Sequence, residues 1–248
     1  MNTGMGKIVI QQVTGMPMVW NWLRRAKKFT LLLPLFLSAT TLPVAAQFAK
    51  VEPATSTNGY IARLLINEVP FPGDHAYESQ TDSQACMYQI LWVLHSRIYL
   101  IPPRYKQKWV SGVSSTDILD IITGTGGRRQ CEGFYRDDQG NFITDPRVEV
   151  RLNRLLKIAN SGGKPGRFAA LINYAQGLAT AYYVGGIEGA DRFAGLTNID
   201  SVAVTGHAYS WMTDIDDYHP GGNFVYIPTE NDGSLGGNRF FTLRKIPK

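Results

Sequence analysis

An apolar helix face near residue 60 ends in a carboxylate. Three residues follow the i, i+3, i+4 spacing of a buried helix face, namely Ile61, Leu64 and Leu65. We therefore predict a helix over residues 59–68. The next position on that face, i+7, is Glu68, and Pro70 two residues later cannot continue the helix. The pattern places an acidic side chain on the buried side of a helix, at its last turn, beside a loop.

Further segments carry the spacing or the end signals of helices. One apolar stripe runs through residues 86–98, and a short helix over 117–122 follows residues with capping-box spacing. Asp145-Pro146 is a strong helix start, an N-cap followed by proline at the first helical position. Residues 167–184 are apolar on one side and end at a glycine pair.

The pattern changes after residue 200. The segments SVAVTGHAYSWM, NFVYIP and RFFTLR are short, aromatic and β-branched, with Gly and Asn between them. We predict three or four antiparallel strands. Because helices come first and strands last, without β-α-β alternation, the chain is expected to be an α+β domain, mainly helical with a small C-terminal antiparallel sheet.

The first 46 residues have the pattern of an export signal. RRAKK precedes an apolar run of 11 residues, and small residues at Val44 and Ala46 precede Gln47. The run is too short to span a bilayer comfortably and contains Pro34. We expect cleavage before Gln47 and export to the periplasm, the cell envelope or the medium, with membrane contact only through this signal.

The charge balance argues against a nucleic-acid partner. The chain has 25 Lys and Arg against 20 Asp and Glu, a net charge of +5. Residues 1–46 hold five of the basic residues and no acid, so the remaining 202 residues carry 20 of each sign. The excess of positive charge belongs to the export signal. We expect a monomer with a polar leader over residues 47–58 and a single domain over 59–248.

Two cysteines remain in the exported part. In an oxidising compartment, Cys86 and Cys131 are expected to form one disulfide. His75 and His219 lie in predicted loops with no spacing typical of a metal site, so no metal is expected. No organic cofactor is expected either.

Burial gives Glu68 a chemical use. A glutamate at a helix end ordinarily turns to solvent or pairs with a cation, here Arg63 or Arg97. A glutamate lodged against apolar neighbours instead loses hydration of its charged form, so its pKa rises and it holds a proton near neutral pH. A general acid that protonates a glycosidic oxygen needs this property.

Three segments, in order, resemble the cell wall hydrolases of the spore-cortex-lytic type, members of the lysozyme-like superfamily. IARLLINE, a loop and a helix ending VLHSRI are similar to the family's opening, where one helix ends in the catalytic Glu and the next in an Asn-Arg pair. DILDIITGTGGRRQCEGF resembles its apolar helix, Gly-Gln turn and Gly-Phe. GHAYSW and GGNRFF are similar to its Gly-Ala-aromatic strand and closing Gly-Asn-x-x-Phe.

The resemblance spans residues 60–135 and 205–242 and has clear departures. Ser96-Arg97 stands where the family has Asn-Arg, and the loop after Glu68 is long and rich in proline. Residues 145–185 match no specific family segment.

The resemblance implies a lysozyme-like fold and cleavage of the β-1,4 bond between N-acetylmuramic acid and N-acetylglucosamine in peptidoglycan. In a lytic transglycosylase, Glu68 would protonate the leaving oxygen and then take the proton of the muramyl 6-hydroxyl. A muramidase would use water and a second carboxylate on the other face of the sugar. Asp74, Glu78 and Asp82, in the adjoining loop, are the candidates, although loop acids are usually just solvated and we favour that interpretation for all three.

Several residues are candidates for contacts with the sugar. Gln130 sits at the turn that matches the family's Gly-Gln segment, where it would hydrogen-bond an N-acetyl group. Tyr209 and Trp211 alternate with His207 on a predicted strand and would stack on pyranose rings. Each has a simpler interpretation: an exposed loop residue for Gln130, and core aromatics for the two rings.

Two other classes of protein stay open. QCEGF is similar to the Asp-Cys-x-Gly segment of papain-like cell-wall peptidases, so Cys131, or else Cys86, would be a nucleophile with His207 as its base. A non-catalytic wall-binding module would keep the fold without the acid chemistry. The presence of Glu68 at the expected place argues for the glycosidase.

Overall fold

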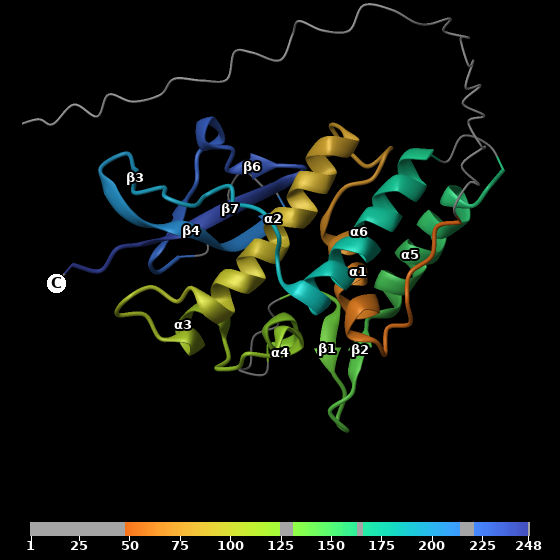
Figure 1. The fold of residues 1–248 in the computed structure, drawn as a ribbon, viewed down its shortest axis with the longest axis horizontal. Coiled ribbons are helices and arrows are strands. Elements are labelled where there is room, and N and C mark those ends of the chain that lie inside the picture. The colour runs from red at the N-terminus through yellow and green to blue at the C-terminus, as the bar shows by residue number, and fades with distance from the viewer. Residues whose placement is uncertain (1–47, 125–130, 163–165, 214–220, 248) are drawn as a thin grey trace, which may run out of the picture. The chain divides into compact units, whose positions relative to one another are not determined.

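The structure, a computed structural model, describes residues 48–124, 131–162, 166–213 and 221–247 (Figure 1). The expected export signal and the candidate Gln130 lie outside these ranges. The helices are α1 (Thr57–Glu68), α2 (Gln80–Tyr99), α3 (Gln107–Ser111), α4 (Ile118–Thr123), α5 (Pro146–Ala159) and α6 (Gly166–Gly185), with a 3-10 turn η1 (Thr229–Asn231). The strands are β1 (Phe134–Arg136), β2 (Phe142–Thr144), β3 (Asn198–Ile199), β4 (Val202–Thr213), β5 (Phe224–Tyr226), β6 (Ser234–Leu235) and β7 (Asn238–Arg244).

The strands form two separate antiparallel sheets. The larger sheet has the order β3-β4-β7-β5, with β6 also paired to β7. The smaller is the hairpin β1-β2, in which Phe134 lies opposite Thr144. The expected α+β class is therefore confirmed. The sheet content is not confined to the C-terminus, because the hairpin lies in the middle of the chain.

Helix α2 occupies the centre of the fold. It packs against β4 of the larger sheet on one side and against α6 on the other, and α6 also contacts α1 and α5 (Figure 1). Its buried side chains include Met87, Ile90 and Leu94, all without solvent exposure. Both faces of α2 are thus covered, which accounts for the wide apolar stripe in this segment. In the described part of the chain, no helix is long and apolar enough to cross a membrane.

Helix boundaries follow the capping residues. The Oγ of Ser79 accepts a hydrogen bond from the N–H of Asp82, so α2 begins six residues before the predicted segment. Asp145 caps α5 and Pro146 occupies its first turn, as predicted. In α4 the cap is Asp117, which accepts from the N–H of Leu119.

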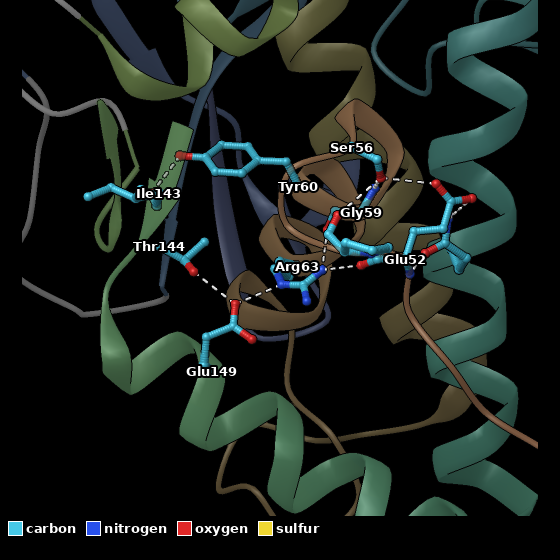
Figure 2. Close-up of polar contacts among 10 residues, drawn as sticks. Glu52, Ser56, Gly59, Tyr60, Arg63, Ile143, Thr144 and Glu149 are labelled. Carbon is cyan, nitrogen blue, oxygen red and sulfur yellow. Dashed lines mark hydrogen bonds and ion pairs between the residues drawn. The ribbon is translucent and has the colours of Figure 1, made fainter. Parts of the chain in front are cut away.

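A buried arginine fixes α1 in place. The side chain of Arg63 donates from Nε to Glu149 of α5 at 2.7 Å and from Nη1 to the carbonyl oxygens of Gly59 and Glu52 (Figure 2). One turn earlier on α1, the hydroxyl of Tyr60 donates to the carbonyl of Ile143 in β2 at 2.9 Å. These contacts tie α1 to α5, to the hairpin and to the segment before it.

Residues 47–58 were expected as a polar leader, but residues 48–56 pack along the helices and α1 begins at Thr57. Ala49 is buried, and its backbone N–H and C=O both pair with the side chain of Asn160 at 2.9 Å. The crossing over α1 requires Gly59, because a Cβ there would lie 2.1 Å from the carbonyl oxygen of Pro53. The segment is part of the folded domain.

Candidate active site

The end of α1 is held by the turn between β6 and β7. The side-chain amide of Asn238 donates to the backbone oxygen of Glu68 at 2.7 Å and contacts the sulfur of Cys86 at 3.4 Å. Gly237 before it has a φ of 72°, and a Cβ there would lie 2.8 Å from the Cβ of Ala76. The Gly-Gly-Asn segment therefore satisfies an orphan carbonyl at the helix C-terminus and fixes the last turn, which carries Glu68.

The carboxyl group of Glu68 receives two hydrogen bonds. The Nε1 of Trp211 on β4 donates to Oε2 at 3.0 Å, and the side-chain amide of Asn67 donates to Oε1 at 3.4 Å. Burial raises the pKa of Glu68; the two hydrogen bonds act against this rise, and the charge of Glu132 adds to it. The group is a carboxylic acid whose proton is held more tightly than in water.

Arg97 lies behind Trp211. Its guanidinium carbon is 5.4 Å from the centroid of the indole ring, and its Nε donates to the backbone oxygen of Tyr209 at 2.7 Å. Burial lowers the pKa of Arg97 to about 10. Arg63, the other cation considered as a partner of Glu68, pairs with Glu149. Arg97 thus supports the ring and the strand that position the donor to Glu68.

Glu68 opens into a cavity of about 450 Å³, which we call the acidic cavity. Its walls are Asn67, Glu68, Cys131, Glu132, Gly133, Asp145, Arg147, Val148, Trp211, Met212 and Thr213. Two other carboxylates, Glu132 and Asp145, share one partner there, since Arg147 lies 3.2 Å from Glu132 and 3.1 Å from Asp145. The cavity combines one half-buried, partly desolvated acid with an ion-paired rim.

The three loop acids expected as a second carboxylate do not line the acidic cavity. Asp74 accepts from the N–H of Phe71 and pairs with Arg151 at 2.8 Å, which braces the loop after α1. Asp82 belongs to the cap of α2, and Glu78 is exposed. Glu132 and Asp145 take their place. Sequence reasoning missed both, and the only signal was the N-cap position of Asp145.

Of the aromatic and histidine candidates on β4, only Trp211 reaches the acidic cavity. The hydroxyl of buried Tyr209 donates to the carbonyl of Leu100 at 2.6 Å, and Nδ1 of His207 pairs with Asp191 at 2.7 Å. Both side chains line a different cavity. The structure therefore does not bring His207 and Tyr209 together with Glu68.

The cysteines do not form the expected disulfide. Cys86 and Cys131 are free, buried thiols. Cys86 lies on α2, packed so closely against Gly236 that a Cβ on this glycine would lie 2.8 Å from the Cβ of Cys86. Cys131 lies on a wall of the acidic cavity. The sulfur of Cys86 meets the side-chain amide of Asn238, so the two thiols have different surroundings.

The thiol chemistry of a peptidase is not assembled either. Burial raises the pKa of Cys86 to about 12 and also raises the pKa of Cys131, whereas a nucleophilic cysteine needs a lowered pKa. Cys131 and His207 line different cavities. The pair expected for a peptidase is therefore not brought together.

Comparison with known proteins finds no match for this chain among protein-family models, curated proteins or solved structures. Within the described residues, no group of three or more His, Cys, Asp and Glu side chains is arranged to hold a metal ion.

Proposed function

We propose that this chain is an exported, lysozyme-like enzyme that cleaves the glycan strands of peptidoglycan with Glu68 as general acid and base. One observation carries the proposal. The carboxyl of Glu68 is half-buried, held by Trp211 and Asn67, and opens into a cavity with carboxylates and a cation on its rim. A buried acid that keeps its proton near neutral pH is what protonation of a glycosidic oxygen requires.

Each step of the reaction follows from this environment. In the first step, protonated Glu68 donates to the oxygen between the two sugars, and burial keeps the proton available. The resulting carboxylate is stabilised by the hydrogen bond from Trp211. In the second step the carboxylate removes the proton of the attacking hydroxyl, so one residue serves both steps.

We favour the muramyl 6-hydroxyl as the attacking group, which makes the enzyme a lytic transglycosylase. Hydrolysis with water would need a second free carboxylate. Asp145 is committed, because it caps α5 and pairs with Arg147, whereas Glu132 has only an exposed pair with the same arginine. A muramidase using Glu132 is the alternative, since the side chain of Glu132 is 82% exposed and reaches solvent.

The products released from peptidoglycan sacculi test the proposal. Purified protein and Glu68→Gln would be incubated with sacculi, and the soluble products identified by mass spectrometry. Anhydromuramic ends made only by the wild type support a transglycosylase, and reducing muramic ends support the muramidase. Stem-peptide fragments from both proteins would support the peptidase instead. Binding to sacculi without any product would support a wall-binding module.

A further inference from the structure

A second cavity lies along the same strand as the acidic cavity. It has a volume of about 510 Å³, and we call it the basic cavity. Its walls are Leu100, Ile101, Pro102, Pro103, Arg104, Thr205, His207, Tyr209, Lys245 and Ile246. They include two cations and a histidine and no acidic side chain, so the cavity is suited to a ligand that is anionic at one end and apolar along its length.

The histidine is held from behind by a buried aspartate. Asp191 accepts from Nε2 of Gln89 at 2.9 Å and from the N–H of Phe193 at 3.0 Å, and its other oxygen lies 2.7 Å from Nδ1 of His207. The side chain of Asp191 is only 2% exposed. This network fixes the orientation of the His207 ring and leaves Nε2 as the ring nitrogen for a ligand in the cavity.

Arg104 stands in a turn that favours another residue. The N–H of Tyr105 donates to the carbonyl of Pro102 at 3.0 Å, and Arg104, the third residue of that turn, has a φ of 73°. Glycine or asparagine is preferred at such a position, because a longer side chain is strained there. The Nη1 of Arg104 donates to the backbone oxygen of Pro247, which places the guanidinium on the wall of the cavity. A guanidinium has five N–H donors, so this one bond does not exhaust its capacity to bind an anion.

From these observations we infer that the basic cavity binds the free carboxylate at the end of a short apolar peptide. Arg104 and Lys245 would hold the carboxylate from two sides, with Nε2 of His207 as a third polar contact. The proline and isoleucine side chains would cover small apolar residues. That the peptide is a stem peptide of peptidoglycan rests on the proposed function; the preference for a free carboxylate does not.

The spacing of the two cavities fits such a substrate. Trp211 lines the acidic cavity and His207 the basic cavity, and both lie on β4. Four residues of a strand span about 13 Å. An extended peptide of four or five residues has the same length. A stem peptide attached to a sugar beside Trp211 is therefore long enough to reach the part of the basic cavity that His207 lines.

Peptide titration tests the inference with the purified full-length chain. The probe is diacetyl-L-lysyl-D-alanyl-D-alanine, and its matched control is the same peptide with a C-terminal amide. We expect the acid to bind at least about tenfold more tightly than the amide, because charge-assisted hydrogen bonds are lost in the amide. Arg104→Gln and Lys245→Gln should each weaken binding of the acid about fivefold.

Two further variants separate this site from general charge and from catalysis. Lys157→Gln, an exposed lysine of α5, should leave the affinity unchanged, and so should Glu68→Gln. Equal binding of acid and amide, no binding at about 10 mM, or an equal loss in Lys157→Gln would overturn the inference. A protein that binds the acid but leaves sacculi intact would keep this site and contradict only the glycan-cleaving proposal.

Discussion

Trp211 donates its indole N–H to the carboxyl of Glu68 at 3.0 Å, across 143 positions of the sequence. This bond and the burial of the acid act in opposite directions on the same group. Burial favours the protonated form of Glu68, and the indole favours the ionised form. In the reaction proposed above, Glu68 first gives up a proton and then takes one back. Desolvation favours the first form of the group and the indole N–H the second, so the two together set the pH range in which Glu68 can do both.

Replacing Trp211 by phenylalanine should move the pH dependence of activity. Without the indole N–H, the pKa of Glu68 rises further, since the donor that favours its ionised form is gone. The alkaline limb of the pH–rate profile should therefore shift to higher pH. Activity below that limb should also fall about tenfold because the acid loses its alignment.

The matched control is Trp109→Phe, since Trp109 lies on α3 and is 66% exposed. Rates measured from pH 4 to 9 on both variants decide the matter. An alkaline limb that stays in place in Trp211→Phe would show that the indole does not set the protonation of Glu68.

Glu68→Gln should stabilise the protein at neutral pH while removing its activity. Because burial raises the pKa of Glu68 above its unfolded value, the folded state holds the proton over a pH range where the unfolded state has lost it. Wild-type stability therefore falls as pH rises through that range, and the glutamine variant lacks this loss.

Urea unfolding at several pH values measures the effect. The advantage of Glu68→Gln should be smallest below about pH 4 and grow by up to about 1.4 kcal/mol per pH unit within the range. A constant difference across all pH values, or one that shrinks as pH rises, is the result that the burial argument forbids.

The ion pairs of Arg63 and Arg147 should differ sharply in their contribution to the free energy of unfolding. Arg63 is buried, and its replacement by methionine removes a donor from two backbone carbonyl groups and from Glu149, which keeps only Thr144. We expect a loss of about 3 kcal/mol in the free energy of unfolding. Arg147→Met is the comparison, because its pair with Glu132 is exposed, and it should cost far less. Equal losses in chemical denaturation would mean that Arg63 does not anchor α1.

The two cysteines should behave as protected thiols. Burial raises the pKa of both groups, so neither forms the reactive thiolate easily at neutral pH. Iodoacetamide should label neither in the folded protein and both after unfolding without a reducing agent. Mass spectrometry counts the added groups. A denatured protein that takes up no label would reveal the disulfide that the structure lacks.

The sequence predicted the elements whose signals are local. Ile61, Leu64 and Leu65 are fully buried, and Asp145 with Pro146 starts α5 as expected. The hairpin β1-β2 was not predicted, because its strands have only three residues and no alternation of buried and exposed positions. The turn between the two strands did have a local signal, because an aspartate favours turns by accepting hydrogen bonds from nearby N–H groups. Asp137 accepts such bonds from the N–H groups of Gln139 and Asn141.

The candidate site was predictable only in part, for a related reason. Glu68 stood out because it interrupts an apolar face, which is a local pattern. Glu132, just before the hairpin, and Asp145, at the start of α5, line the same cavity as Glu68 only because of the tertiary fold. No spacing in the sequence predicts that they lie together. His207 was expected beside Trp211, but β-bulges in β4 and the buried Asp191 give it a separate cavity.

The rate at which purified protein releases soluble fragments from peptidoglycan sacculi tests the central claim most directly. Wild type would be compared with Glu68→Gln and with Glu230→Gln, a glutamate in the exposed turn η1. We predict that Glu68→Gln lowers the rate by about 10²- to 10⁴-fold, the usual share of a general acid, and that Glu230→Gln matches the wild type. Equal release by wild type and a folded Glu68→Gln protein would contradict the account.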